Sequence, residues 1–98
     1  MQLVNDGKVN LEGEKVALVF YIPEHCAGCK RAIKILQDKP LTNWKVFLVD
    51  SEAEANRSLI NQYNVSMAPT IITFEKGVQK DFLAGLKAFI EKKDIFDE

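Results

Sequence analysis

The sequence has little cysteine and even less histidine: two cysteines and one histidine among 98 residues. A closed structural zinc site takes four cysteine or histidine ligands, so a single chain holds too few to build one. We therefore expect no metal and no cofactor within one chain. A metal or an iron–sulfur cluster shared between two chains stays open, because two copies together would supply four thiolates.

The sequence also has no excess of either charge sign and few long apolar runs. The formal net charge is −1, and Lys and Arg form no block that indicates a nucleic-acid or membrane partner. The longest apolar run, Val16 to Ile22, is far too short to span a bilayer. The amino end has no basic region followed by an apolar one, so we expect no signal peptide and a cytoplasmic location. The length fits a single domain over residues 1–98, and we expect a monomer.

The two cysteines stand at the most informative stretch of the chain. Val16 to Ile22 is apolar and β-favouring throughout, which predicts one buried strand, and Pro23 ends it because proline has no N–H to donate. Cys26 and Cys29 follow, and the pattern turns helical at Ala27. The dipole and unpaired N–H groups at a helix start favour negative charge, so a thiol placed there ionises more readily than a free one. Because the thiolate is the species that attacks disulfides, this stretch predicts a dithiol–disulfide exchange site.

Helical and β-type patterns alternate after the dithiol. Apolar residues at helical spacing predict helices, and short β-rich runs between turn residues predict strands. The predicted elements are a helix from Ala27 to Lys39 ended by Pro40, a strand from Lys45 to Asp50, a helix from Glu52 to about Tyr63, strands from Thr70 to Phe74 and from Val78 to Leu83, and a helix from Leu86 to Phe96. The first strand, helix and second strand predict a parallel βαβ unit, and the last two strands predict an antiparallel hairpin.

Three local patterns carry further expectations. Asn5-Asp6-Gly7 is a turn signal, which predicts a small hairpin within residues 3–11. Ser51, with Glu54 three residues later, matches a capping box at the start of a helix. The acidic residues within Asp94 to Glu98 indicate a solvated tail.

The order βαβ, α, ββα with a Cys-x-x-Cys at the first strand-to-helix junction resembles the thioredoxin family. Three motifs in register carry this resemblance: Cys26-Ala27-Gly28-Cys29-Lys30 after a buried strand, Val65-Ser66-Met67-Ala68-Pro69-Thr70 before the third strand, and Phe74-Glu75-Lys76-Gly77 with Gly85 eight residues later. The resemblance implies an α/β thioredoxin fold, with a central four-stranded mixed sheet and three flanking helices. An N-terminal hairpin or strand is a possible addition.

The resemblance also implies roles for four residues. Cys26, the more exposed sulfur at the helix start, is the expected nucleophile, and Cys29 is the expected resolving thiol. Pro69 is expected to follow a cis peptide bond and to pack against the dithiol. Ala68 is then expected to pair through its backbone with an extended segment of the partner.

The sequence departs from the usual family pattern at several positions. Gly28 stands where most thioredoxins have proline, and His25 where they have tryptophan. We expect both to modulate the dithiol, together with Lys30, whose charge adds positive potential. Phe20 falls where the family carries a buried acid that relays a proton of the second cysteine, and phenylalanine cannot do this.

Three functions remain in competition on the sequence. The leading one is a dithiol–disulfide oxidoreductase that reduces protein disulfides in the cytosol and is recharged by a reductase or a small-thiol system. The second is a glutaredoxin-like protein that uses a small thiol such as glutathione. The third is a binding subunit with the same fold, in which the dithiol is dispensable.

Overall fold

A computed structural model describes all residues, 1–98, and shows one mixed five-stranded sheet with helices on both faces. In chain order the elements are β1 (Gln2–Val4), β2 (Lys15–Tyr21), α1 (Ala27–Gln37), β3 (Lys45–Asp50), the 3₁₀ turn η1 (Glu54–Asn56), α2 (Arg57–Gln62), β4 (Thr70–Glu75), β5 (Val78–Ala84), α3 (Leu86–Lys92) and the 3₁₀ turn η2 (Lys93–Asp97). The α/β thioredoxin fold expected from the sequence is confirmed, with the additional strand at the amino end. No helix combines the length and apolarity that crossing a membrane would take.

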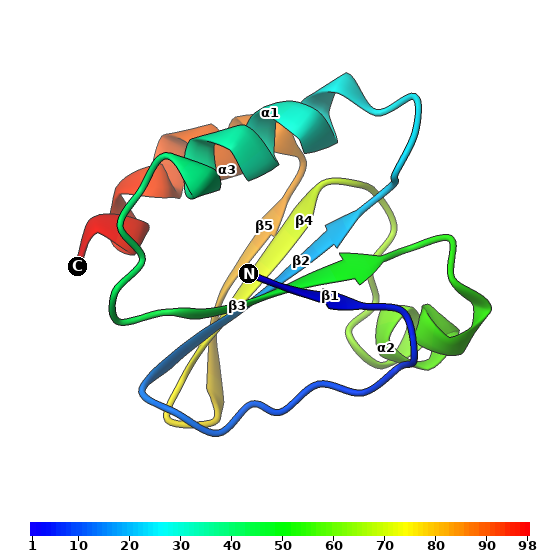
Figure 1. Cartoon of the computed structure of the whole chain (residues 1–98), viewed down its shortest axis with the longest axis horizontal. Helices are drawn as coiled ribbons and strands as arrows, with labels where there is room; N and C mark the ends of the chain where they lie inside the picture. Colours follow the sequence, from blue (N-terminus) through cyan, green and yellow to red (C-terminus); the bar gives the residue numbers. More distant parts are fainter.

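The strands lie in the order β1-β3-β2-β4-β5. β1 and β2 both pair in parallel with β3, while β4 is antiparallel to β2 and to β5. Helices α1 and α3 cover one face of the sheet and α2 covers the other (Figure 1). Because the parallel strands end on the same side, β2 and β3 deliver their following loops to one edge of the molecule, at the right of Figure 1.

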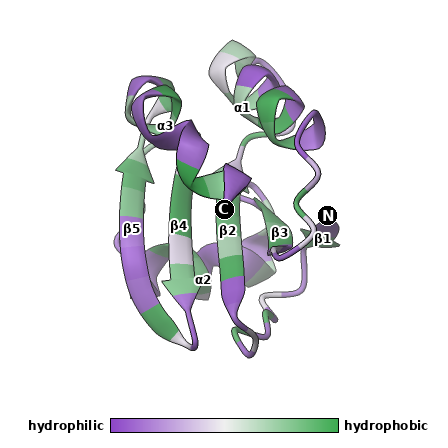
Figure 2. Cartoon of the chain, turned by 90° about the vertical axis from the view of Figure 1, so that its left-hand side faces the viewer, coloured by the Kyte–Doolittle hydropathy of each residue, from purple (hydrophilic) through white to green (hydrophobic).

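β2 is the centre of the core because it is buried on both faces. The five residues from Val16 to Phe20 have no exposed surface. Ala17 and Val19 point into the cluster under α1 and α3, while Leu18 and Phe20 belong to the cluster on the α2 side. Figure 2 shows the resulting contrast between the mainly hydrophobic β2 and the more hydrophilic edge strand β5. The continuous apolar run read from the sequence is therefore a central strand, as predicted.

The predicted N-terminal hairpin is wrong, although the strand itself exists. β1 pairs with β3 and not with the following segment, which forms no strand between β1 and β2. The reason is a tertiary contact at the turn: the Gly7 N–H donates to Asn56 Oδ1 (2.9 Å), and a Cβ on Gly7 would lie 2.3 Å from the Ala55 carbonyl oxygen. The turn docks against η1, and the chain then travels to β2 without folding back on β1.

The predicted capping box at Ser51 is also wrong. Ser51 Oγ is buried and has no hydrogen-bond partner, and α2 begins only at Arg57 after η1. Ser51 is held instead by its backbone, whose N–H donates to the Tyr21 carbonyl (2.8 Å). Glu54, the other half of the predicted box, forms an ion pair with Arg57 at 3.2 Å.

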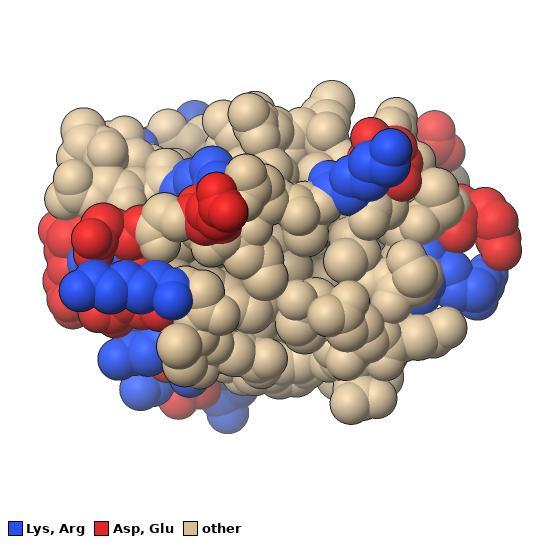
Figure 3. Space-filling view, turned by 90° about the horizontal axis from the view of Figure 1, so that it is seen from below, with Lys and Arg blue, Asp and Glu red and all other residues tan.

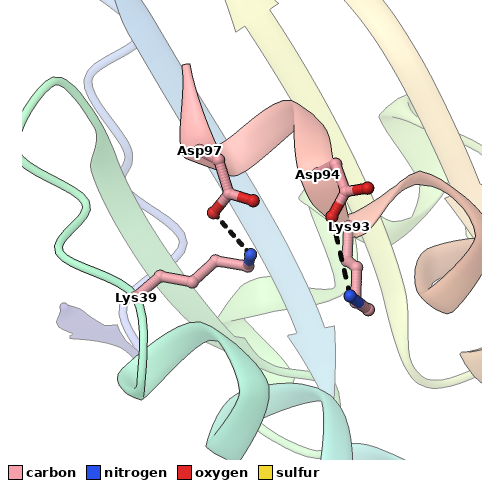
Figure 4. Close-up of polar contacts among 4 residues, drawn as sticks. All are labelled: Lys39, Lys93, Asp94 and Asp97. Carbon is pink, nitrogen blue, oxygen red and sulfur yellow. Dashed lines mark hydrogen bonds and ion pairs between the residues drawn. The ribbon is translucent and has the colours of Figure 1, made fainter.

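The carboxyl-terminal segment is not a solvated tail. α3 ends at Lys92, earlier than predicted, and η2 continues the chain so that Phe96 is buried beside Phe89 and Trp44. Lys39, just after α1, has a largely buried side chain whose Nζ lies 2.6 Å from Asp97 (Figure 4). α1 itself stops at Gln37, two residues before its predicted end.

The surface on the α2 side carries charges of both signs around its rim and an uncharged centre (Figure 3). Lysine and arginine side chains lie next to acidic ones on both ends of this view. This intermixing agrees with the near-neutral net charge of the sequence.

Candidate active site

The dithiol lies where the loop after β2 enters α1. Cys26 is the N-cap residue of α1 and Cys29 lies in its first turn, and the two sulfurs form a disulfide with 5.2 Å between the Cα atoms. Cys26 is partly exposed, whereas only 1% of Cys29 is accessible. The predicted difference in exposure is confirmed, and only the Cys26 sulfur is placed to meet another molecule.

Each sulfur accepts a hydrogen bond from a backbone N–H. The Cys29 N–H donates to Cys26 Sγ over 3.2 Å, and the Ile22 N–H donates to Cys29 Sγ over 3.4 Å. The first of these N–H groups belongs to the unpaired set at the helix start, which also carries the positive end of the helix dipole. When the disulfide is reduced, both contacts favour negative charge on sulfur.

The loop before β4 packs against the dithiol. The Ala68–Pro69 peptide bond is cis, as expected from the sequence, and Pro69 is buried. The Ala68 carbonyl oxygen lies 3.9 Å from Cys26 Sγ. Two hydrogen bonds fix the loop: Thr70 Oγ1 donates to the Met67 carbonyl (2.7 Å), and the Gly85 N–H donates to the Pro69 carbonyl (2.8 Å). The Ala68 N–H has no hydrogen-bond partner within the chain.

Comparison with known proteins agrees with this geometry. The thioredoxin family profile matches residues 5–95. The chain is 33% identical to a thioredoxin of Rickettsia typhi over 89 residues, which is 89% of this chain and 81% of that protein, and 30% identical to a thioredoxin of Rickettsia felis over the same shares. A solved thioredoxin from Plasmodium falciparum shares the fold, with a TM-score of 0.77, 20% identity, and coverage of 99% of this chain and 97% of that one. The chain belongs to the thioredoxin family.

Within the thioredoxin family, a chain with this Cys26–Cys29 pair is a thiol–disulfide oxidoreductase. The pair can open to two thiols and close again, which transfers two electrons. The structure also shows where this member differs from the usual pattern around that pair.

Of the residues predicted to modulate the thioredoxin site, Gly28 alone contacts it. A Cβ on Gly28 would lie 3.4 Å from Pro69 Cδ, so the residue lies flat against the cis-proline loop. The His25 side chain is 94% exposed, and its Nε2 lies 3.9 Å from the Glu24 carboxylate and makes no contact with sulfur. Lys30 is exposed and pairs with no acidic side chain.

The position of the family's buried acid is apolar here. Phe20 has no exposed surface and packs into the cluster on the α2 side of the sheet. β2 therefore places no carboxylate near Cys29. The titratable side chains at the carboxyl ends of β2 and β3 are Tyr21 and its register partner Asp50. Burial raises the pKa of Tyr21, and the Asp50 carboxylate raises it further.

The sequence does not predict the backbone contacts that hold the Cys29 sulfur. The Ser51 N–H donates to the Tyr21 carbonyl, and the N–H of the same peptide group, that of Ile22, donates to Cys29 Sγ. Hydrogen bonds in such a chain polarise one another, so β3 supports the sulfur through β2. These are backbone groups, and no residue type signals them in a sequence.

Proposed function

We propose that the chain reduces disulfide bonds of partner proteins in the cytosol, as a monomer acting through residues 1–98. The supporting observation is the asymmetry of the dithiol: a partly exposed Cys26 sulfur caps the start of α1, and a buried Cys29 sulfur lies one turn behind it. Such an arrangement gives one sulfur that attacks and a second that resolves. Five surface cavities have linings that include neither cysteine, which favours a protein partner over a small thiol held in a pocket.

The reaction proceeds in two exchange steps. The Cys26 thiolate attacks one sulfur of the partner's disulfide, a bond forms between these two sulfurs, and the partner's other sulfur leaves as a thiolate that takes up a proton. Cys29, having lost its proton, then attacks Cys26 Sγ, closes the intrachain disulfide and releases the partner's second sulfur. Two electrons have passed from the dithiol to the partner, and a reductase or a small-thiol system returns them.

Ala68 and Pro69 hold the partner during the attack. The unpaired Ala68 N–H and its carbonyl, close to Cys26 Sγ, suit an extended segment that pairs in the manner of an added strand. Pro69 keeps this segment of backbone facing the sulfur. Three residues modulate the thiolate: Gly28 by its fit against Pro69, Lys30 by its charge at the first turn, and His25 from an exposed position next to Cys26 in the sequence.

The decisive experiment is mixed-disulfide trapping with Cys29→Ser, with Cys26→Ser as the matched control. Reduced wild type should reduce insulin disulfides, and Cys29→Ser should accumulate a covalent complex with insulin that reductant releases. Cys26→Ser should give neither reaction nor complex. Trapping through Cys29 in the Cys26→Ser variant would overturn the assignment of the two sulfurs.

The same assay separates the competing functions. Reduction of glutathione mixed disulfides without reduction of insulin would support the glutaredoxin-like function. Absence of activity in wild type and both variants would support a binding subunit with a dispensable dithiol. Recharging by a thioredoxin reductase, compared with recharging by glutathione, identifies the class of reducing system.

A further inference from the structure

The thiol of Cys29 must lose its proton before it can attack Cys26 Sγ in the second exchange step. Only 1% of Cys29 is accessible, so its sulfur is largely shielded from bulk water. The fully buried Phe20, which occupies the position of the family's acid, has no group that accepts a proton. The proposed reaction therefore needs a proton acceptor from another part of the site.

A single peptide group separates the Cys29 sulfur from the carboxyl end of β3. On one side of this group the Ile22 N–H donates to Cys29 Sγ over 3.4 Å. On the other side the Tyr21 carbonyl accepts from the Ser51 N–H over 2.8 Å. Because the nitrogen and oxygen of one peptide group are close together, Cys29 Sγ and the Ser51 nitrogen lie within about 9 Å of each other. Asp50, the last residue of β3, directly precedes this nitrogen.

The Asp50 side chain lies on the face of the sheet that α1 covers. Asp50 and Tyr21 are register partners, so their side chains project from the same face. Tyr21 packs against the core cluster under α1 and α3, and the first turn of α1 holds Cys29. Burial raises the pKa of Tyr21 and the Asp50 carboxylate raises it further, which is the effect of a neighbouring negative charge. Asp50 and Cys29 thus lie at the same end of the sheet, where α1 begins (Figure 1).

The Asp50 carboxylate is half-buried and is free to bind a proton. Its Oδ1 accepts the Glu52 N–H at 2.8 Å, which holds the carboxylate at the strand end, and its Oδ2 has no hydrogen-bond partner within the chain. Asp50 takes part in none of the ion pairs of the chain. Since no cation neutralises this carboxylate, its capacity to accept a proton is retained.

No other carboxylate competes for this role from the elements around Cys29. The charged or titratable side chains of the loop before α1, of the first turn of α1, of β2 and of the loop after β3 are Tyr21, Glu24, His25, Lys30 and Glu52. Glu24, Lys30 and Glu52 are exposed, and His25 is directed to solvent beside Glu24. The loop before β4 carries no charged residue from position 65 to position 69.

We propose that Asp50 accepts the proton of Cys29 in the second exchange step, and so supplies from β3 the acceptor that β2 lacks. This inference rests on the proposed reduction of protein disulfides. The proton passes from Cys29 Sγ to the carboxylate through one water molecule. The Cys29 thiolate then forms a bond with Cys26 Sγ, and the bond from Cys26 to the partner's sulfur breaks. The partner's sulfur leaves with the electron pair and takes up a proton from solvent, to which Asp50 also returns its own.

The test follows the two exchange steps separately by stopped-flow absorbance. Reduced protein is mixed with an equimolar amount of dithiobis-nitrobenzoate, a disulfide that releases two coloured thiolates in succession. The first release reports attack by Cys26, and the second reports closure by Cys29. In Asp50→Asn the first release should keep its wild-type rate, and the second should be about tenfold slower at neutral pH. At alkaline pH, where Cys29 loses its proton directly to hydroxide, the second release should approach the wild-type rate.

Two further variants separate the carboxylate from its surroundings. Glu52→Gln removes the exposed carboxylate of the neighbouring residue but keeps the N–H that binds Asp50, so both releases should have wild-type rates. Asp50→Glu retains a carboxylate at a slightly different position, so its second release should lie between the rates of wild type and Asp50→Asn. An unchanged first release in each variant shows that the fold around Cys26 is intact.

Each outcome has a separate meaning for the two proposals. Equal second-release rates in wild type and Asp50→Asn at neutral pH would overturn the role of Asp50. A faster second release would overturn it too, since it would show that the carboxylate only repels the Cys29 thiolate. Slowing of the same size at every pH would show a structural effect and would also overturn it, while reduction of insulin through Cys26 stands. Absence of the second release in wild type, together with failure on insulin, would overturn the proposed function itself.

Discussion

Replacing Asn56 by alanine should lower the free energy of unfolding by about 3 kcal/mol, because the side chain makes three buried or half-buried hydrogen bonds. Asn56 has no exposed surface. Its Oδ1 accepts from the Gly7 N–H (2.9 Å), and its Nδ2 donates to the carbonyls of Val4 (2.7 Å) and Asp50 (2.8 Å). One side chain thus joins the end of β1, the turn after it and the end of β3.

The magnitude follows from these contacts. Each lost hydrogen bond costs about 0.5–1.5 kcal/mol net, and a buried group left without a partner costs about 1–3 kcal/mol. Water can reach the half-buried partners of Asn56, and this reduces the cost of leaving them unpaired. The sum of about 3 kcal/mol is a large share of the roughly 5–15 kcal/mol that stabilises a domain. Denaturant unfolding of the oxidised protein, followed by the fluorescence of its single tryptophan, Trp44, measures the loss.

Two further variants sharpen the test. Asn61→Ala removes an exposed amide from α2 and should change stability by less than about 0.5 kcal/mol. Asn56→Asp keeps the acceptor for the Gly7 N–H, but places a second oxygen where Nδ2 donates to the carbonyls of Val4 and Asp50. Only the protonated carboxyl can donate to a carbonyl, so the protonated form is favoured. Since the folded pKa of that carboxyl is then raised, the variant should be less destabilised in acid than at neutral pH. A loss under about 1 kcal/mol for Asn56→Ala, or one equal to that of Asn61→Ala, would refute the reasoning.

Two other predictions concern charge near the strand ends and the dithiol. Burial and Asp50 raise the pKa of Tyr21, so the folded state resists ionisation of this phenol. The free energy of unfolding should therefore be constant with respect to this group below its ordinary pKa of about 10, and should decline as the pH rises above that value. Asp50→Asn should lower the midpoint of one of the two tyrosinate transitions seen by ultraviolet absorbance, and an unchanged titration would contradict the assigned cause. His25→Ala should change the thiolate fraction of Cys26 by no more than about twofold, since the imidazole is 94% exposed and away from sulfur; a larger change in the thiolate titration would show a direct contact in the reduced state.

The elements that the sequence predicts well are those with a continuous local signal. Val16 to Ile22 is apolar without interruption, and all of it but Ile22 lies in β2 (Lys15–Tyr21), with the dithiol at the following helix start, as expected. The antiparallel pairing of β4 with β5 follows from the short turn between them, which returns the chain alongside β4. Local composition was sufficient there because the tertiary structure imposes the same conformation as the local preference.

The predictions that failed did so where a distant contact decides the local conformation. The hairpin signal around Gly7 was overridden by Asn56, which lies 49 residues away in sequence. The capping pattern at Ser51 was overridden because its N–H binds the Tyr21 carbonyl at the end of the sheet. The sequence pattern predicts a helix up to Phe96, but the burial of Phe96 beside Trp44 draws the acidic end of the chain onto the core.

The candidate site consists of backbone groups, which substitutions leave in place, and of side chains, which substitutions change. The sulfur atoms are held by the backbone N–H groups of Cys29 and Ile22, and any residue other than proline at position 22 would supply the second of these as long as the strand and helix ends stay in place. The exposed side chains at the rim, such as His25 and Lys30, contribute no such contact to either sulfur. We therefore expect selectivity among partners to depend on exposed side chains around the dithiol, and the exchange chemistry to depend on the backbone that presents Cys26.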